Sequence, residues 1–360
     1  MISFGEKEWD KTRDTYRKWW CGELGRPILP CVFWGKDAGR NNPNIPLLSY
    51  ENCLDLSVSP EQIIDRYDYE LSCCEFAGDS FPCMQMSQFG PGIMAAFLGA
   101  KPAYGKATVW FKPDCVIPLE DLHFEYDPDN IWWRRVSDIY RAGMQKWRGN
   151  VVMAITDLGG ILDLLAVFRS TENLLFDLYD NPTEVKRLVN ELSTVWMRYY
   201  CEITDILKGS QGYSDWATIY YEKPSYMLQS DFSYMIGSDM FRQYAEGELR
   251  STADMLGGAF YHLDGVGELK HLDDILKIES IRGIQWIPGE GAARLQDWSE
   301  VYRKISSAGK KLQVPYDLDC YLEDVLACVS SPDTIIKMQT TYPITEKNRI
   351  MRKLKAYGAE

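Results

Sequence analysis

Residues 229–291 alternate helical with extended patterns and are the most informative part of the sequence for the fold. They contain QSDFSYMIGSDMF (229–241), the helical YAEGELRSTADML (244–256), GAFYHLDG (258–265) and RGIQWIPGEG (282–291). Short apolar segments separated by amphipathic helices are typical of parallel α/β folds. His262 and Asp264 stand at the end of one such segment. They are therefore predicted at the carboxyl end of a strand, where α/β enzymes build their sites.

Eight segments of the chain have the composition of core strands. They span residues 28–35, 83–90, 151–160, 212–219, 258–265, 281–289, 310–317 and 334–341. Helical patterns separate most of them, including two helices broken at Asn181-Pro182 and one helix over 238–256 with Ser238 as its cap. This alternation predicts a single (β/α)8 TIM barrel over residues 1–360, with residues 1–25 forming a helix that covers the barrel. A doubly wound open sheet is the alternative, but no glycine-rich dinucleotide fingerprint follows the first strand.

Composition excludes several classes of protein. The 39 basic and 52 acidic residues give a net charge of −13, which argues against non-specific binding to nucleic acid or anionic membranes. No apolar run is long enough to span a bilayer, and the charged amphipathic N-terminus lacks a signal-peptide core. The ten cysteines are scattered without a CxxC pair, so we expect free thiols in a cytoplasmic protein, a composition that suits an anaerobe.

The predicted strand ends carry acidic, amide and aromatic residues, which suits a pocket for a small planar or ring-bearing ligand. Asp157, His262 and Asp264, with Asp231 in the QSDFS loop, are the candidate catalytic residues; a purely structural role in capping the adjacent helices and turns is the alternative for each. His271 is predicted on a solvated helix face. The candidate pocket wall consists of Trp34, Trp216, Trp286, Glu290 and Tyr316.

Five blocks, in order along most of the chain, resemble the uroporphyrinogen decarboxylase superfamily. They are FGPGIMAAFLGA (89–100), TDLGGILDLLAVFRSTENLLFDLYDNP (156–182), MLQSDFSYMIGSDMF (227–241), FYHLDGVGELKHLDDIL (260–276) and IQWIPGEG (284–291). The chain is most similar to the branch near the corrinoid-dependent methyltransferases, whose members are often described as trimethylamine-corrinoid-protein-like. The resemblance implies a TIM barrel, in agreement with the strand count.

For the methyltransferase branch, the resemblance implies a zinc ion that activates a small methylated substrate. The usual His-x-Cys ligand pair reads His262-Leu263-Asp264 here, so His262, Asp264 and Glu290 are the expected metal ligands. Oxygen ligands leave a harder metal that suits O-methyl substrates better than thiols. No Asp-x-His-x-x-Gly cobalamin motif is present, so a corrinoid would be carried by a separate partner protein. A homodimer is common among relatives.

Two other functions stay open. A decarboxylase acting on a tetrapyrrole or a related carboxylic acid would use cations and a pyrrole-binding aspartate, for which this chain offers Lys36, Arg40 and Asp79. The absence of the His-x-Cys pair also fits a non-catalytic protein that binds a corrinoid or tetrapyrrole.

Overall fold

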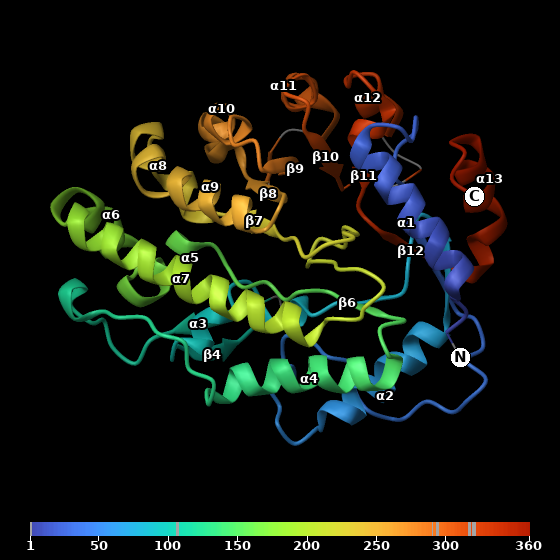
Figure 1. Cartoon of the computed structure of the whole chain (residues 1–360), viewed down its shortest axis with the longest axis horizontal. Helices are drawn as coiled ribbons and strands as arrows, with labels where there is room; N and C mark the ends of the chain where they lie inside the picture. The colour runs from blue at the N-terminus through green and yellow to red at the C-terminus, as the bar shows by residue number, and fades with distance from the viewer. Residues whose placement is uncertain (1, 106–107, 290, 293–294, 316–317, 319–321) are drawn as a thin grey trace.

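The computed structural model describes residues 2–105, 108–289, 291–292, 295–315, 318 and 322–360. Its helices are α1 (Glu6–Cys21), α2 (Pro60–Ser72), α3 (Met94–Phe97), α4 (Ile131–Trp147), α5 (Ile161–Arg169), α6 (Thr171–Asp180), α7 (Pro182–Ile206), α8 (Ser238–Tyr244), α9 (Glu246–Met255), α10 (Leu272–Leu276), α11 (Ser299–Ser307), α12 (Leu322–Leu326) and α13 (Lys347–Ala356). Its strands are β1 (Pro30–Trp34), β2 (Cys74–Gly78), β3 (Cys83–Met84), β4 (Lys101–Tyr104), β5 (Val109–Lys112), β6 (Val152–Met153), β7 (Met227–Gln229), β8 (Ala259–Asp264), β9 (Ile281–Ile287), β10 (Lys311–Val314), β11 (Ile335–Lys337) and β12 (Thr340–Pro343). Helices α8 to α12 lie outside strands β7 to β10 (Figure 1).

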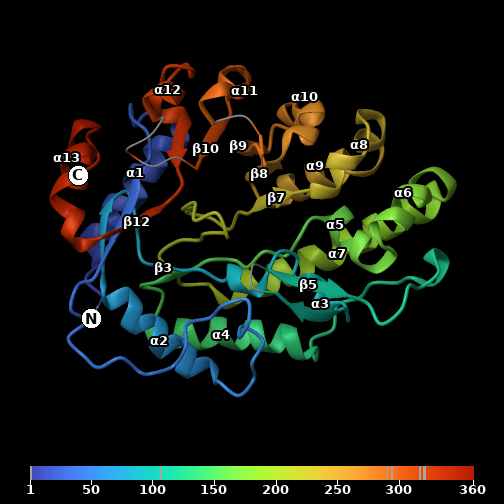
Figure 2. The ribbon, with the colours of Figure 1, turned by 180° about the vertical axis from the view of Figure 1, so that it is seen from behind.

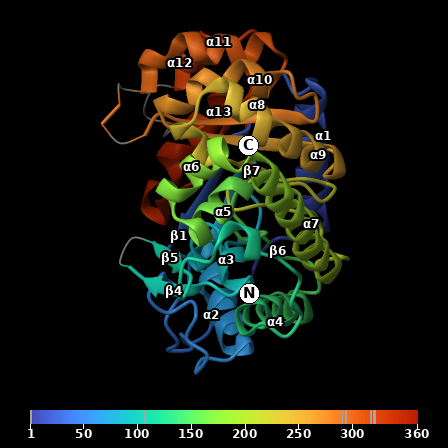
Figure 3. The same cartoon turned by 90° about the vertical axis from the view of Figure 1, so that its left-hand side faces the viewer.

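The main sheet has the strand order β11-β10-β9-β8-β7, and all its pairings are parallel. Parallel neighbours need a crossover, and α10, α11 and α12 provide it between successive strands from β8 to β11. In three views these helices lie at one end of the molecule, and α2 and α4 lie side by side at the opposite end (Figures 1, 2 and 3). The predicted α/β class with a parallel sheet is thereby confirmed.

The remaining strands form three smaller sheets. β1 pairs in parallel with β12 and antiparallel with β2, β3 pairs in parallel with β6, and β4 and β5 form a hairpin. Two isolated parallel bridges, Ile28–Ile336 and Ile155–Asp215, extend the parallel arrangement. Among the described strands, these pairings do not close into an unbroken ring.

The predicted strand at 212–219 is wrong. This segment makes only the isolated bridges Ile155–Asp215 and Tyr213–Tyr221, whereas β7, which was not predicted, occupies the place beside β8. The reason is local: the Asp215 carboxylate accepts hydrogen bonds from the Ala217 amide at 3.0 Å and the Tyr221 hydroxyl at 2.9 Å, and Thr218 has a φ of 60°. These contacts turn the chain where a strand would continue.

The helical predictions hold in one place and fail in another. The break at Asn181-Pro182 is confirmed, because α6 ends at Asp180 and α7 begins at Pro182. The single helix predicted over 238–256 is instead two helices that meet at Ala245, whose φ is −110°. Ser238 does not cap α8; Gly237 occupies the N-cap position, and the Ser238 hydroxyl donates to the Lys270 carbonyl at 3.2 Å.

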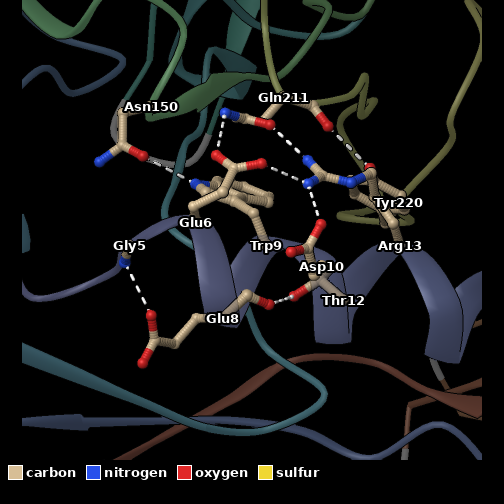
Figure 4. Close-up of polar contacts among 10 residues, drawn as sticks. All are labelled: Gly5, Glu6, Glu8, Trp9, Asp10, Thr12, Arg13, Asn150, Gln211 and Tyr220. Carbon is tan, nitrogen blue, oxygen red and sulfur yellow. Dashed lines mark hydrogen bonds and ion pairs between the residues drawn. The ribbon is translucent and has the colours of Figure 1, made fainter.

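Helix α1 covers the amino-terminal ends of the strands. Its buried face, Trp9, Tyr16 and Trp19, packs in one cluster with strand residues that include Met227 and Phe260. The Trp9 indole donates to the Asn150 side chain at 2.8 Å, and Arg13 binds Glu6, Asp10 and the Gln211 side chain (Figure 4). These contacts tie α1 to the loops that follow α4 and α7, so the carboxyl ends of the strands are left for a site.

The helices in the described part of the chain include none with both the length and the apolar character that a bilayer crossing demands. Nine of the ten cysteines lie within the described residues, and all nine are free thiols.

Candidate active site

The structure brings His262, Asp264 and Asp231 together at the carboxyl ends of β7 and β8. His262 and Asp264 are two positions apart on β8 and therefore project from the same face of the sheet. Asp231 begins the short 3-10 helix Asp231–Met235 that follows the neighbouring strand β7. One donor atom from each residue lies within 4.8 Å of the other two, and His262 Nε2 is 4.0 Å from Asp264 Oδ2.

Asp163, which was not predicted as a site residue, holds Asp231 in place. Its carboxylate, in the first turn of α5, accepts hydrogen bonds from the backbone N–H groups of Phe232 at 2.6 Å and Asp231 at 3.1 Å. A side chain at Gly160 would prevent this arrangement, because a Cβ there would lie 2.2 Å from the Asp163 carboxylate and 2.4 Å from the Gln229 carbonyl. The Gly159-Gly160 pair before α5 is the sequence signal for this close approach.

His271 also contacts the 3-10 helix Asp231–Met235, through the Ser233 carbonyl. The prediction that it is solvated is wrong: its ring is fully buried, stacks on Phe241 at 4.5 Å and meets the Ser233 carbonyl through Nε2 at 2.9 Å. The carbonyl can only accept, so His271 donates this hydrogen bond. The polar pattern of the 266–276 segment hid this contact because it comes from a different part of the chain.

Acidic side chains crowd around the three donors. Burial raises the pKa of Asp157 and of Asp163 to about 7, and the nearby Asp231 carboxylate adds to the rise at Asp163. The surrounding protein and the carboxylates of Asp264 and Asp157 raise the pKa of Asp231 to about 7. Burial, together with Asp231 and Asp163, raises the pKa of Glu268 to about 10. Within the described ranges, no lysine or arginine forms an ion pair with any of these five acids.

The His262 ring is suited to binding a cation. Burial lowers its pKa, so the ring is neutral near pH 7 and keeps one nitrogen lone pair. Nδ1 is hydrogen-bonded to the side-chain oxygen of Gln285, whereas Nε2 faces Asp264. Gln229 and Gln285 are the register partners of His262 on β7 and β9, and Gln313 is the partner of Gln285 on β10. The Gln285 and Gln313 side chains continue the polar row that His262 begins.

A hollow of about 370 Å³ opens beside these acids, a volume suited to a small molecule. Its lining residues are Tyr234, Asp264, Gly265, Val266, Pro288, Gly289, Gly291 and Ala292. The hollow lies next to the His262 cluster, because Asp264 belongs to both.

The predicted aromatic wall is present only in part. The Trp216 ring lies 5.1 Å from the His262 ring in an edge-to-face arrangement. Trp286 does not face the site, because it pairs with Leu263 and so projects from the sheet face opposite to His262, where it packs against Trp298. Trp34 ends β1 with 55% of its surface exposed.

The three residues predicted to bind a tetrapyrrole acid, two cations and a pyrrole-binding aspartate, have partners elsewhere. The Lys36 ammonium contacts the Ser3 hydroxyl at 3.0 Å, and Arg40 pairs with Asp65 and Asp68 on α2. Asp79 is buried at the amino end of β1, away from the cluster, in a two-pronged ion pair with Arg26. The reason is topological: β2 runs antiparallel to β1, so the residue after β2 reaches the other end of the sheet. Glu290 and Tyr316 lie outside the described residues.

The Arg26–Asp79 pair predicts a stability effect without a functional one. Asp79→Ala removes the partner of a nearly buried guanidinium, which costs roughly 3 kcal/mol in such pairs. We therefore expect a lower free energy of unfolding in urea and no change in ligand binding at the His262 cluster, with the exposed Asp254→Ala as the control. If Asp79→Ala instead weakened ligand binding and left the free energy of unfolding unchanged, Asp79 would be a binding residue.

The comparison with solved structures identifies a class of fold. The chain is similar to a methyltransferase from Methanosarcina mazei with a TM-score of 0.57 and 11% sequence identity, over 89% of this chain and 96% of that chain. No family model matches the chain, and no curated protein matches it in sequence. The chain therefore has the fold of a methyltransferase, established by structure and not by sequence.

Proposed function

We propose that this protein is a methyltransferase that moves a methyl group between a small methylated substrate and a corrinoid carried by a separate protein. The observation that carries the proposal is the His262, Asp264 and Asp231 cluster, with its donor atoms within 4.8 Å of one another. The shared fold with a methyltransferase supports the reaction class. The volume beside Asp264 suits a small substrate.

The residues present fit a zinc ion. One neutral imidazole and two carboxylates form a nitrogen and oxygen donor set that zinc accepts in catalytic sites, with a position left for substrate. Asp231 and Asp264 lack lysine or arginine partners among the described residues, so a divalent cation would neutralise charges that are otherwise uncompensated. When bound, zinc supplies Lewis acidity toward the oxygen or sulfur that carries the methyl group. Asp231 is the third donor among the described residues, and Glu290, the third ligand expected from the sequence, lies outside them.

Two other residues would contribute: Asp157 would protonate the leaving group, and Trp216 would help to orient the His262 ring. Asp157, whose pKa burial raises to about 7, can hold a proton near neutral pH and donate it to a leaving alkoxide or amine. Glu268 is fully buried against Tyr261, which precedes His262 on β8 and projects from the opposite sheet face. The Trp216 edge restricts the His262 ring on one side.

For the fold, we propose that β1, β3, β6, β7, β8, β9, β10 and β11 form one closed (β/α)8 barrel. The bridge Ile28–Ile336, between the residues before β1 and strand β11, supports this arrangement.

The geometry favours methyl transfer over decarboxylation. A tetrapyrrole acid needs several cations at one mouth, and Lys36 and Arg40 are turned toward Ser3 and toward α2. When ionised, the Asp231 and Asp264 carboxylates beside His262 would repel substrate carboxylates.

The proposal is tested by zinc-loaded protein mixed anaerobically with free cob(I)alamin and one methylated compound at a time. The panel contains a methyl ether, methanol, a methyl thioether and a methylated amine. We expect the methylcobalamin absorbance to appear with at least one member and to be abolished when the protein is first treated with a chelator. No methylcobalamin from the panel, together with chelator-resistant decarboxylation of a tetrapyrrole acid, would overturn the proposal.

A further inference from the structure

We infer that Gln285 and Gln313 are positioning residues that fix the tautomer of His262, with its proton on Nδ1 and a bare Nε2 toward Asp264. The three side chains form one chain of hydrogen bonds across neighbouring strands β8, β9 and β10. The inference deepens the proposed function, because a bare Nε2 is what a ligand at this site requires.

The direction of these hydrogen bonds is set at Gln313, the residue farthest from His262 in the series. Gln313 meets the backbone carbonyl of Ala217 at 3.0 Å, and because a carbonyl only accepts, the Gln313 NH2 group must face it. The Gln313 oxygen then faces Gln285 at 2.6 Å and must receive the Gln285 NH2 group. The Gln285 oxygen is left to face His262 Nδ1, and this pair is a hydrogen bond only if Nδ1 carries the proton.

Burial makes this order strict. Gln285 and Gln313 are each 1% exposed, so reversing one amide would place two acceptors or two donors against each other without water to replace the lost bond. Ala217 also belongs to a held turn, because its N–H donates to Asp215 at 3.0 Å and the Asp215 carboxylate accepts from Tyr221. The Ala217 carbonyl, which orients the Gln313 amide, is therefore held by the fold and does not depend on a ligand.

The test reads the tautomer directly. Long-range ¹H–¹⁵N correlation spectra of the imidazole nitrogens, recorded on metal-free full-length protein near pH 7.5, separate protonated from bare nitrogens. Only three histidines are present, so His262→Gln assigns the signals. We expect His262 in the parent protein with a protonated Nδ1 and a bare Nε2. A protonated Nε2 in the parent would overturn the inference, whether or not any variant folds.

Two isosteric variants extend the test. Gln285→Met and Gln313→Met should each raise the share of the Nε2-protonated form by roughly fivefold to tenfold, the worth of one hydrogen bond. Gln285→Met should also weaken zinc binding by about 10- to 100-fold, as loss of an outer partner of a metal-bound histidine does. Gln243→Met is the control, because Gln243 is exposed on α8, bonds the Tyr244 hydroxyl at 3.0 Å and takes no part in these hydrogen bonds. Unchanged tautomer populations in both relay variants would contradict the inference.

The outcomes separate this inference from the proposed function. If Nδ1 is protonated but the protein binds no zinc, the proposed metal site is wrong and the hydrogen-bond chain through Gln285 and Gln313 stands. If Nε2 is protonated and the protein binds zinc, the inferred role of Gln285 and Gln313 is wrong and the metal site stands.

Discussion

Replacing His262 with alanine is expected to remove the bound zinc and to lower the rate of methyl transfer by on the order of a thousandfold or more. The expectation follows from the donor set: without the imidazole only the carboxylates of Asp231 and Asp264 remain, and burial and the neighbouring carboxylates raise the pKa of Asp231 to about 7. The measurement is metal content per chain after dialysis, followed by the methylcobalamin assay on the same preparation.

His123→Ala is the matched control, because its side chain is 70% exposed and pairs with Glu191 far from β8 along the chain. It should retain the metal content and rate of the parent. One zinc per chain in His262→Ala would show that the ion binds elsewhere, and the proposed role of His262 would then be wrong.

Prediction from sequence worked for strands β8 and β9 because their patterns are complete within the strand. GAFYHLDG is a buried run closed by a glycine with a φ of 79°, so both its type and its carboxyl end are readable locally. GYSDWATI at 212–219 has the same composition, yet the Asp215 carboxylate accepts hydrogen bonds from inside its own turn. Pairing with a neighbouring strand decides between these outcomes, and a single segment does not contain that information.

The sequence predicted site residues whose position depends only on where a strand ends. It did not predict which sheet face a side chain projects from or how the buried amides are oriented. His262, Asp264 and Asp231 lie together because parallel strands β7 and β8 end at one edge. Trp286 is one residue past Gln285 and therefore projects from the other face, which only the register with Leu263 reveals. Gln313 carried a signal that was not used: an amide within the buried strand KLQV needs a buried partner.

Metal-free protein is expected to become less stable as the pH rises, by on the order of 10 kcal/mol between pH 5 and pH 9. Burial raises the pKa of Asp157 to about 7, that of Glu248 to about 8 and that of Glu268 to about 10. The unfolded chain releases the same protons near pH 4, so between these values the folded state binds more protons. Its stability is therefore full below about pH 4 and is lost as each folded carboxyl ionises. Urea unfolding in chelator at fixed ionic strength measures the slope.

Asp157→Asn should flatten that slope, since the amide oxygen can still accept the Gly159 N–H, which lies at 2.9 Å from the carboxylate, but the side chain no longer ionises. Asp254→Asn, an exposed change on α9, should leave the slope unaltered. Added zinc should act in the opposite sense and stabilise the protein more at pH 8 than at pH 5, because only ionised carboxylates and a neutral imidazole bind it. Stability that is flat or rising with pH in chelator would mean that the acids are already compensated by other groups. In that case the unpaired charge that motivates the metal site would be absent.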